Sequence, residues 1–260
     1  MIYKRFAANL RAQNWFAIAI EFAIVVAGVF VGTLVANANQ ERLQRKETRR
    51  LLVQIKPDLK TLADIFSAAR QYYTTTRRYA DTALAGWRAD RRVSDRDFVV
   101  AAYQASQIYG LTFDPGTWAS IMGADQVRSL DDAKLRRELS TVLYADYAPL
   151  KIEALYTSYR QNVRRLIPLE LQEQIRDRCG DRTRPSDGVV TLPATCDLTV
   201  DPAVAAAAAT KLRAHPDLAD DLAWHFAVIA LYLSEAQASD QDMRALSADI
   251  DNYVGGEASR

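Results

Sequence analysis

One uninterrupted apolar stretch lies near the N-terminus, over residues 15–36 (WFAIAIEFAIVVAGVFVGTLVA). Glu21 and the mildly polar Thr33 are the exceptions within it. As a helix the stretch rises about 33 Å, at about 1.5 Å per residue, which matches the hydrocarbon thickness of a bilayer. Trp15 and Phe16 stand at its start, where aromatic rings favour the headgroup region. The pattern predicts a transmembrane helix over 15–36.

Two other interpretations of residues 15–36 stay open. The first is a cleaved signal peptide, but the apolar run is longer than usual for one and carries a carboxylate. A weak cleavage site follows at Val35–Ala38. The second is a buried helix of a soluble core, which the length of the run disfavours.

A polar and small-residue stripe follows one face of this helix. Successive residues advance about 100° around a helix, so five residues with suitable spacing share one direction. These residues form the anchor stripe: Asn14, Glu21, Gly28, Gly32 and Asn39. The pair Gly28 and Gly32 is a GxxxG motif, which lets two helix backbones approach closely in lipid.

Glu21 has three possible roles. A charged side chain in hydrocarbon costs on the order of 3 kcal/mol, so it is expected to face a partner or to become protonated. It can hydrogen-bond across an oligomer, line an ion or proton path, or lie close enough to the membrane surface to be hydrated. Its alignment with the two glycines favours the first role.

The side of the membrane on which the body lies is not decided by charge, because basic residues both precede and follow the apolar stretch. Cys179 and Cys196 bracket a segment rich in Gly, Pro, Asp and Thr. A disulfide between them would remove roughly 3 kcal/mol of unfolded-state entropy and would persist outside the cytoplasm. Two reduced thiols are the alternative. We expect residues 1–14 to be a cytoplasmic tail and the body to be extracytoplasmic.

The rest of the chain is predicted to be all-α. Residues 37–56 form a charged juxtamembrane helix, whose basic side chains are either solvated or in contact with anionic lipid headgroups. Residues 57–260 form a bundle of about six or seven helices with a loop around 180–200. An apolar seam with steps of three and four runs from Leu52 to Trp87, and another runs from Leu222 to Tyr253. Pro57 is expected to kink or restart the first of these helices.

Shorter helices are expected between the two seams. Ser94 begins one that lasts to about Tyr109, and a short one follows over 114–123. Asp131 or Asp132 begins a long helix, which Pro149 kinks and which continues to Pro168. Two more are expected, one over 169–178 and one that Asp201–Pro202 starts and that ends near His215.

Composition and motifs exclude several kinds of function. The chain has 33 Lys and Arg against 32 Asp and Glu, without the basic excess typical of nucleic-acid-binding proteins. Two Cys and two His at their spacings do not suggest a zinc site. No nucleotide-binding, zinc-protease or serine-hydrolase motif is found. His225 falls on an apolar seam, which favours a buried, hydrogen-bonded histidine over a ligand. We therefore expect no enzyme activity, no cofactor and no metal.

Two segments resemble an uncharacterised family of bacterial proteins with one N-terminal membrane span. The first is the anchor from Ala19 to Gly32, with its Glu and Gly, followed by an Asn and a charged helix. The second, weaker match runs from Thr112 to Tyr144. Residues 36–39 depart from the family, in which a Trp is often found there. The resemblance covers about a quarter of the chain, implies a bacterial inner-membrane protein, and brings no catalytic residue with it.

These observations favour a non-enzymatic, single-pass inner-membrane protein with a periplasmic helical domain. Its expected partners are a second copy of itself or another membrane protein, together with the lipid bilayer, and no nucleic acid. Two alternatives stay open: an ion-conducting or proton-coupled assembly that uses Glu21, and a periplasmic sensing or docking module of a larger membrane complex.

Overall fold

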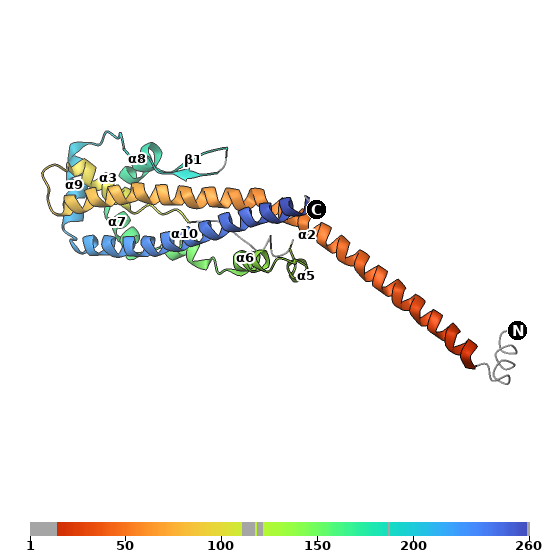
Figure 1. Ribbon diagram of the computed structural model, residues 1–260. Coiled ribbons are helices and arrows are strands. Elements are labelled where there is room, and N and C mark those ends of the chain that lie inside the picture. Colours follow the sequence, from red (N-terminus) through yellow and green to blue (C-terminus); the bar gives the residue numbers. More distant parts are fainter. Residues whose placement is uncertain (1–14, 111–117, 119–121, 187, 259–260) are drawn as a thin grey trace.

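The protein is all-α, as predicted, in a computed structural model that describes residues 15–110, 118, 122–186 and 188–258. Figure 1 shows an elongated body with a single helix projecting from one end. The α-helices of the described part are α2 (Trp15–Trp87), α3 (Asp95–Ala105), α5 (Ala124–Arg128), α6 (Ala133–Tyr144), α7 (Ser158–Leu166), α8 (Leu169–Cys179), α9 (Pro202–Arg213) and α10 (Asp217–Ala258).

Helix α2 is continuous from the apolar anchor into the centre of the body. It runs through Pro57, so the chain does not restart a helix there. Pro57 lacks the N–H that would bond to the carbonyl of Val53, four residues earlier. Both residues lie on the exposed side of the helix, where water can satisfy that carbonyl. The proline is therefore accommodated without breaking α2.

The body is organised around the antiparallel pair of α2 and α10, which lie side by side in Figure 1. Both predicted seams are confirmed as buried faces: Leu52, Ile55, Leu59, Phe66 and Tyr73 on α2, and Leu222, Ile229, Tyr232, Met243 and Ile250 on α10. The rings of Tyr73 and Tyr232 meet edge to face with their centroids 5.5 Å apart. Burial of each such side chain contributes on the order of 2 kcal/mol.

The other helices cover this pair at its two ends. Helices α3, α7, α8 and α9 form one apolar cluster with the distal part of α2, and α5 and α6 pack near the part of α2 that follows the apolar stretch. The starts of α3, α6 and α9 follow the predicted caps: Ser94 accepts from the amide of Asp97, Asp132 from those of Lys134 and Leu135, and Asp201 from that of Ala203. The cap at Asp132 decides between the two candidates, Asp131 and Asp132.

Two predicted helix ends are wrong. Helix α3 stops at Ala105 and does not reach Tyr109, because the amide and hydroxyl of Ser106 both bond back to the carbonyl of Tyr103. The single long helix from Asp132 to Pro168 is replaced by α6, the 3₁₀ turns η1 (Ala148–Leu150) and η2 (Ile152–Leu155), and α7. Asp146 accepts from the amide of Ala148, which favours a turn over a helix at this point.

The loop around 180–200 is closed by a disulfide between Cys179 and Cys196, as predicted. Within it β1 (Arg182–Thr183) and β2 (Val190–Thr191) form a short antiparallel ribbon. Gly188 adopts a φ of +70° in the turn between them, where glycine is favoured. The short helix expected over 114–123 lies mostly outside the described residues. Within this range, Trp118 and Met122 are described, and both are buried.

Gly86 provides a test of the contact between α2 and α3. A Cβ at this position would lie 2.1 Å from Cδ2 of Phe98 and 2.9 Å from its Cβ. We expect Gly86→Ala to lower the free energy of unfolding by about 1–3 kcal/mol, despite the better helix propensity of alanine. Urea unfolding followed by circular dichroism measures this. Gly255→Ala is the matched control, because no atom lies within 4 Å of its added Cβ; equal stabilities of the two variants would contradict the packing.

Candidate functional site

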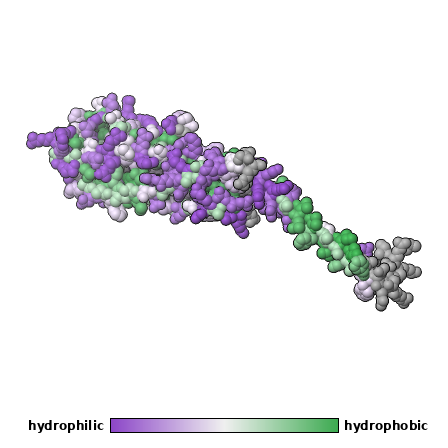
Figure 2. Space-filling view, viewed as in Figure 1, coloured by the Kyte–Doolittle hydropathy of each residue, from purple (hydrophilic) through white to green (hydrophobic). Residues whose placement is uncertain are grey.

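No described residue of the body packs against the anchor part of α2, residues 15–36. The side chains from Glu21 to Glu47 are all exposed, and the apolar ones among them form the green rod that projects from the body in Figure 2. This is the one helix of the described part that is long and apolar enough to cross a membrane. Its surface is therefore free to contact lipid or another protein.

The anchor stripe lies along this uncovered rod. Glu21 and Asn39 are exposed, and no atom lies within 4 Å of a Cβ built on Gly28 or Gly32. Asn14, the fifth member of the stripe, lies outside the described residues. The four described members share one side of the continuous helix, since their spacing matches whole numbers of helical turns.

The stripe faces away from the side of α2 that carries the body. Thr48 is the first buried side chain after the anchor, and its hydroxyl hydrogen-bonds to that of Ser129 over 2.9 Å. It follows Asn39 by about two and a half helical turns, so it points in the opposite direction. Burial thus begins within residues 37–56, and the body leaves the stripe uncovered.

A second group of polar side chains surrounds the buried end of α3. The last carbonyls of a helix have no partner within it and carry partial negative charge. Here Tyr159 donates to the carbonyl of Ala102 over 2.8 Å, and Arg160 donates to that of Ser106 over 2.5 Å. Arg164 donates to the Ser106 hydroxyl over 3.0 Å. Helix α7 therefore caps the C-terminus of α3.

Arg160 and Arg164 supply positive charge at this helix end. Burial and repulsion by Arg160 lower the pKa of Arg164 to about 10, so its guanidinium group stays charged at neutral pH. It also lies over the ring of Tyr103, with 4.6 Å between its Cζ and the ring centroid. Sequence reasoning missed these two arginines; their spacing by one turn beside the buried Tyr159 and Val163 is the signal that was available.

His225 is fully buried and hydrogen-bonded, as its seam position predicted. Its Nδ1 lies 2.8 Å from the hydroxyl of Thr157. Burial, helped by repulsion from Arg160, lowers the pKa of His225 to about 4, and the carbonyl of Ala105 acts in the opposite direction. The imidazole is therefore neutral at physiological pH and joins α10 to the segment before α7.

The disulfide lies next to the same group of residues. Gln104 on α3 donates to the carbonyl of Cys179 over 2.5 Å, and Arg96 donates to the carbonyls of Cys196 and Leu198. Arg96 thus attaches the second cysteine to the start of α3. The disulfide loop is fixed to the body at both cysteines.

Tyr72 on α2 is linked to Asp181, which follows α8 near the start of the disulfide loop. Its hydroxyl donates to a carboxylate oxygen of Asp181 over 2.8 Å. Burial raises the pKa of Asp181, whereas the hydrogen bond from Tyr72 and the charges of Arg160 and Arg164 lower it. These side chains hydrogen-bond to one another and to backbone groups, an arrangement that holds α2, α3, α7 and the loop together.

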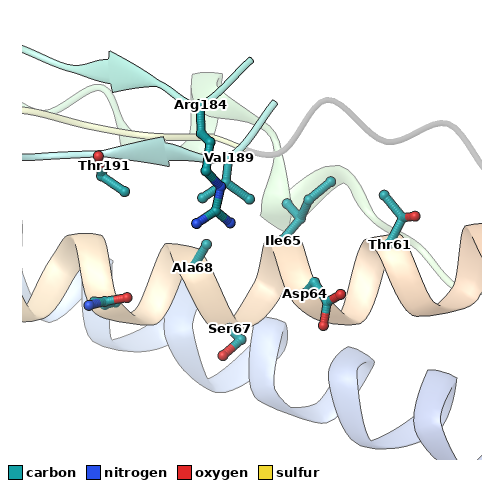
Figure 3. A pocket seen from close by; sticks show the side chains of 9 residues that line it. Thr61, Asp64, Ile65, Ser67, Ala68, Arg184, Val189 and Thr191 are labelled. Carbon is teal, nitrogen blue, oxygen red and sulfur yellow. The ribbon is translucent and has the colours of Figure 1, made fainter. Parts of the chain in front are cut away.

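A shallow polar pocket of about 320 Å³ lies between α2 and the β-ribbon. Figure 3 shows Arg184 reaching from the ribbon toward Ala68, while Asp64 and Ser67 extend along the other side of α2. Asp64 is already paired with Lys60, 2.8 Å away. The polar side chains at this pocket do not converge on one point, and no group of three metal-ligating side chains is found among the described residues.

Comparison with known proteins returns no match: no family model, no curated protein and no solved structure is similar to the chain. The resemblance of the anchor to an uncharacterised bacterial family therefore stays a prediction. Function is inferred below from the fold and from the side chains described above.

The buried imidazole predicts a specific pH dependence of stability. Because the pKa of His225 is lowered from 6.5 to about 4 on folding, its stabilising contribution is complete above pH 6.5 and is lost as the pH falls toward 4. The full loss is about 3 kcal/mol. We expect His225→Gln to reduce the fall in unfolding free energy between pH 6.5 and 4, measured by urea titration of the full chain in detergent.

His215→Gln is the matched control, since His215 is exposed. It should keep the pH dependence of the parent protein. An unchanged slope in His225→Gln would show that the buried imidazole does not titrate as described.

Proposed function

We propose that this protein is a non-enzymatic, single-pass membrane protein that self-associates through its anchor and presents a helical domain outside the cytoplasm. The observation that carries the proposal is the uncovered anchor stripe on the apolar part of α2, opposite the body. No described residue of the body is a partner for Glu21, so we infer that a neighbouring helix provides one.

The chemistry of the stripe supports association between two anchors. Helices in lipid gain little from the hydrophobic effect and associate through close packing and interhelical hydrogen bonds. Gly28 and Gly32 allow the backbones to approach, and Glu21 lies about two turns earlier on the same side. A hydrogen bond across the pair would shelter a carboxyl group that is unfavourable in hydrocarbon.

The position of the body supports the same arrangement. Helices that pair through GxxxG cross at about −40° and therefore diverge beyond the crossing point. Each body sits on the side of its own α2 that faces away from the stripe. Two bodies would then lie on the outer sides of a diverging pair, without colliding at the membrane surface.

The proposed location rests on the disulfide and on the resemblance. A bond between Cys179 and Cys196 is typical of proteins that fold outside the cytoplasm. This favours a cytoplasmic N-terminal tail and an extracytoplasmic body. The similarity of the anchor to the uncharacterised bacterial family favours the inner membrane, and so a periplasmic body.

The polar side chains of the body support a structural role rather than catalysis. Tyr159, Arg160 and Arg164 bond to groups at the end of α3, and His225 bonds to Thr157. Each of them satisfies a group that would otherwise be buried without a partner. The function that follows is presentation of a rigid domain on a paired anchor.

Anchor substitutions test self-association. We expect Glu21→Leu and Gly28→Ile each to weaken association about five- to thirty-fold, because each removes about 1–2 kcal/mol of hydrogen bonding or close packing. The protein mass in detergent, from size-exclusion chromatography with light scattering over a concentration series, measures this. Phe30→Leu, on the opposite face, should leave the mass unchanged. Parent-like mass in both stripe variants would contradict the proposal.

Labelling tests the orientation. Arg91 lies exposed in the turn after α2, so Arg91→Cys should react with a membrane-impermeant maleimide on intact cells. Lys4→Cys should react only after the membrane is permeabilised. The native cysteines should resist alkylation under denaturing conditions until a reductant is added. The reverse labelling pattern would place the body in the cytoplasm.

A further inference from the structure

Five basic side chains follow the anchor within residues 41–50 and form a basic collar: Arg42, Arg45, Lys46, Arg49 and Arg50. Glu41 and Glu47 are the acidic residues of this segment, so five positive charges against two leave a net formal charge of +3. The whole collar belongs to the continuous helix α2 and directly follows its apolar part.

The structure divides the collar into two groups. Arg45 pairs with Asp131 at 3.0 Å, and Arg49 donates to the carbonyl of Val254 over 2.5 Å, so both fasten α2 to the body. Arg50 lies 3.7 Å from Glu47. Arg42 and Lys46 are exposed and form no ion pair with any described residue. These two are the charges that the fold itself does not use.

Arg42 and Lys46 lie one turn apart on one side of α2, close to the end of the apolar stretch. At about 1.5 Å per residue, Arg42 is about 9 Å and Lys46 about 15 Å along the axis beyond Ala36. The headgroup region extends roughly 5–8 Å beyond the hydrocarbon. Side chains of a helix tilt toward its N-terminus, which here is the membrane side, so both long side chains lean back toward the bilayer.

We propose that Arg42 and Lys46 bind the phosphate groups of anionic lipids at the surface where the anchor leaves the bilayer. The inference rests only on the membrane-spanning part of the proposed function, and not on self-association. Each basic side chain near an anionic surface contributes about 1 kcal/mol of attraction. Zwitterionic lipids, whose net charge is zero, provide no such attraction.

Lipid binding here would also set the height of the body. Arg45 holds the loop before α6 against α2 less than one turn from Lys46. The edge of the body therefore lies immediately above the headgroups that Arg42 and Lys46 contact. Within the collar, Arg45 and Arg49 would then contact the body, and Arg42 and Lys46 would contact lipid.

Native mass spectrometry of the full chain tests the proposal. The protein in detergent is mixed with equal amounts of phosphatidylglycerol and phosphatidylcholine that have the same acyl chains. We expect the parent to retain phosphatidylglycerol preferentially. Each single change, Arg42→Gln or Lys46→Gln, should reduce that preference about five-fold, and the double variant about thirty-fold.

The double variant Arg88→Gln/Arg91→Gln is the matched control. It removes the same charge from two exposed residues at the distal end of α2, and should keep the parent's preference. Circular dichroism checks that all variants are folded. Equal retention of the two lipids by the parent, or an unchanged preference in Arg42→Gln/Lys46→Gln, would overturn the proposal and leave the collar as a solvated helix face.

The same spectra separate this proposal from self-association, because protein mass and bound lipid are read independently. A monomer that keeps its lipid preference would contradict the paired anchor alone. A dimer without that preference would contradict lipid binding alone.

Discussion

The packing of α10 against one face of α2 is the constraint on which the rest of the structure depends. Because α10 covers only one side of α2, the two seams define which side of the long helix is interior and which is exposed. Because α2 is unbroken, the same packing also fixes which side of the apolar stretch faces away from the body. It leaves the anchor stripe free and directs part of the basic collar away from the body.

The smaller helices depend on polar contacts as well as on apolar burial. The C-terminus of α3 ends inside the body, where its carbonyl groups need donors. Helix α7 provides them through Tyr159 and Arg160, and the disulfide loop is tied to α3 through Gln104 and Arg96. A helix end that would be unfavourable in isolation thus becomes the point where several segments of the chain meet.

The parts of the fold that could be predicted from the sequence are those with a repeated pattern or a local cap. The seams of α2 and α10 repeat over many turns, and the caps at Ser94, Asp132 and Asp201 involve residues only two or three positions apart. The break after α6 was not predicted, because only one local hydrogen bond, from the amide of Ala148 to Asp146, favours a turn over a helix there.

The polar contacts around α3 could not be predicted in the same way. They join Ser106, Arg160 and His225 to partners that lie far away in the sequence, and no periodic pattern marks them. For the anchor the reverse holds. The stripe is visible in the sequence, since a helix converts spacing into direction, whereas its uncovered state depends on where the body begins to pack.

The continuity of α2 has a mechanical consequence. Beyond Ala36 the helix extends for about 75 Å at about 1.5 Å per residue, and the rest of the body is attached to one side of it. The rest of the domain therefore lies to one side of the α2 axis. Any rotation of the apolar part about the helix axis would therefore turn the whole domain through the same angle.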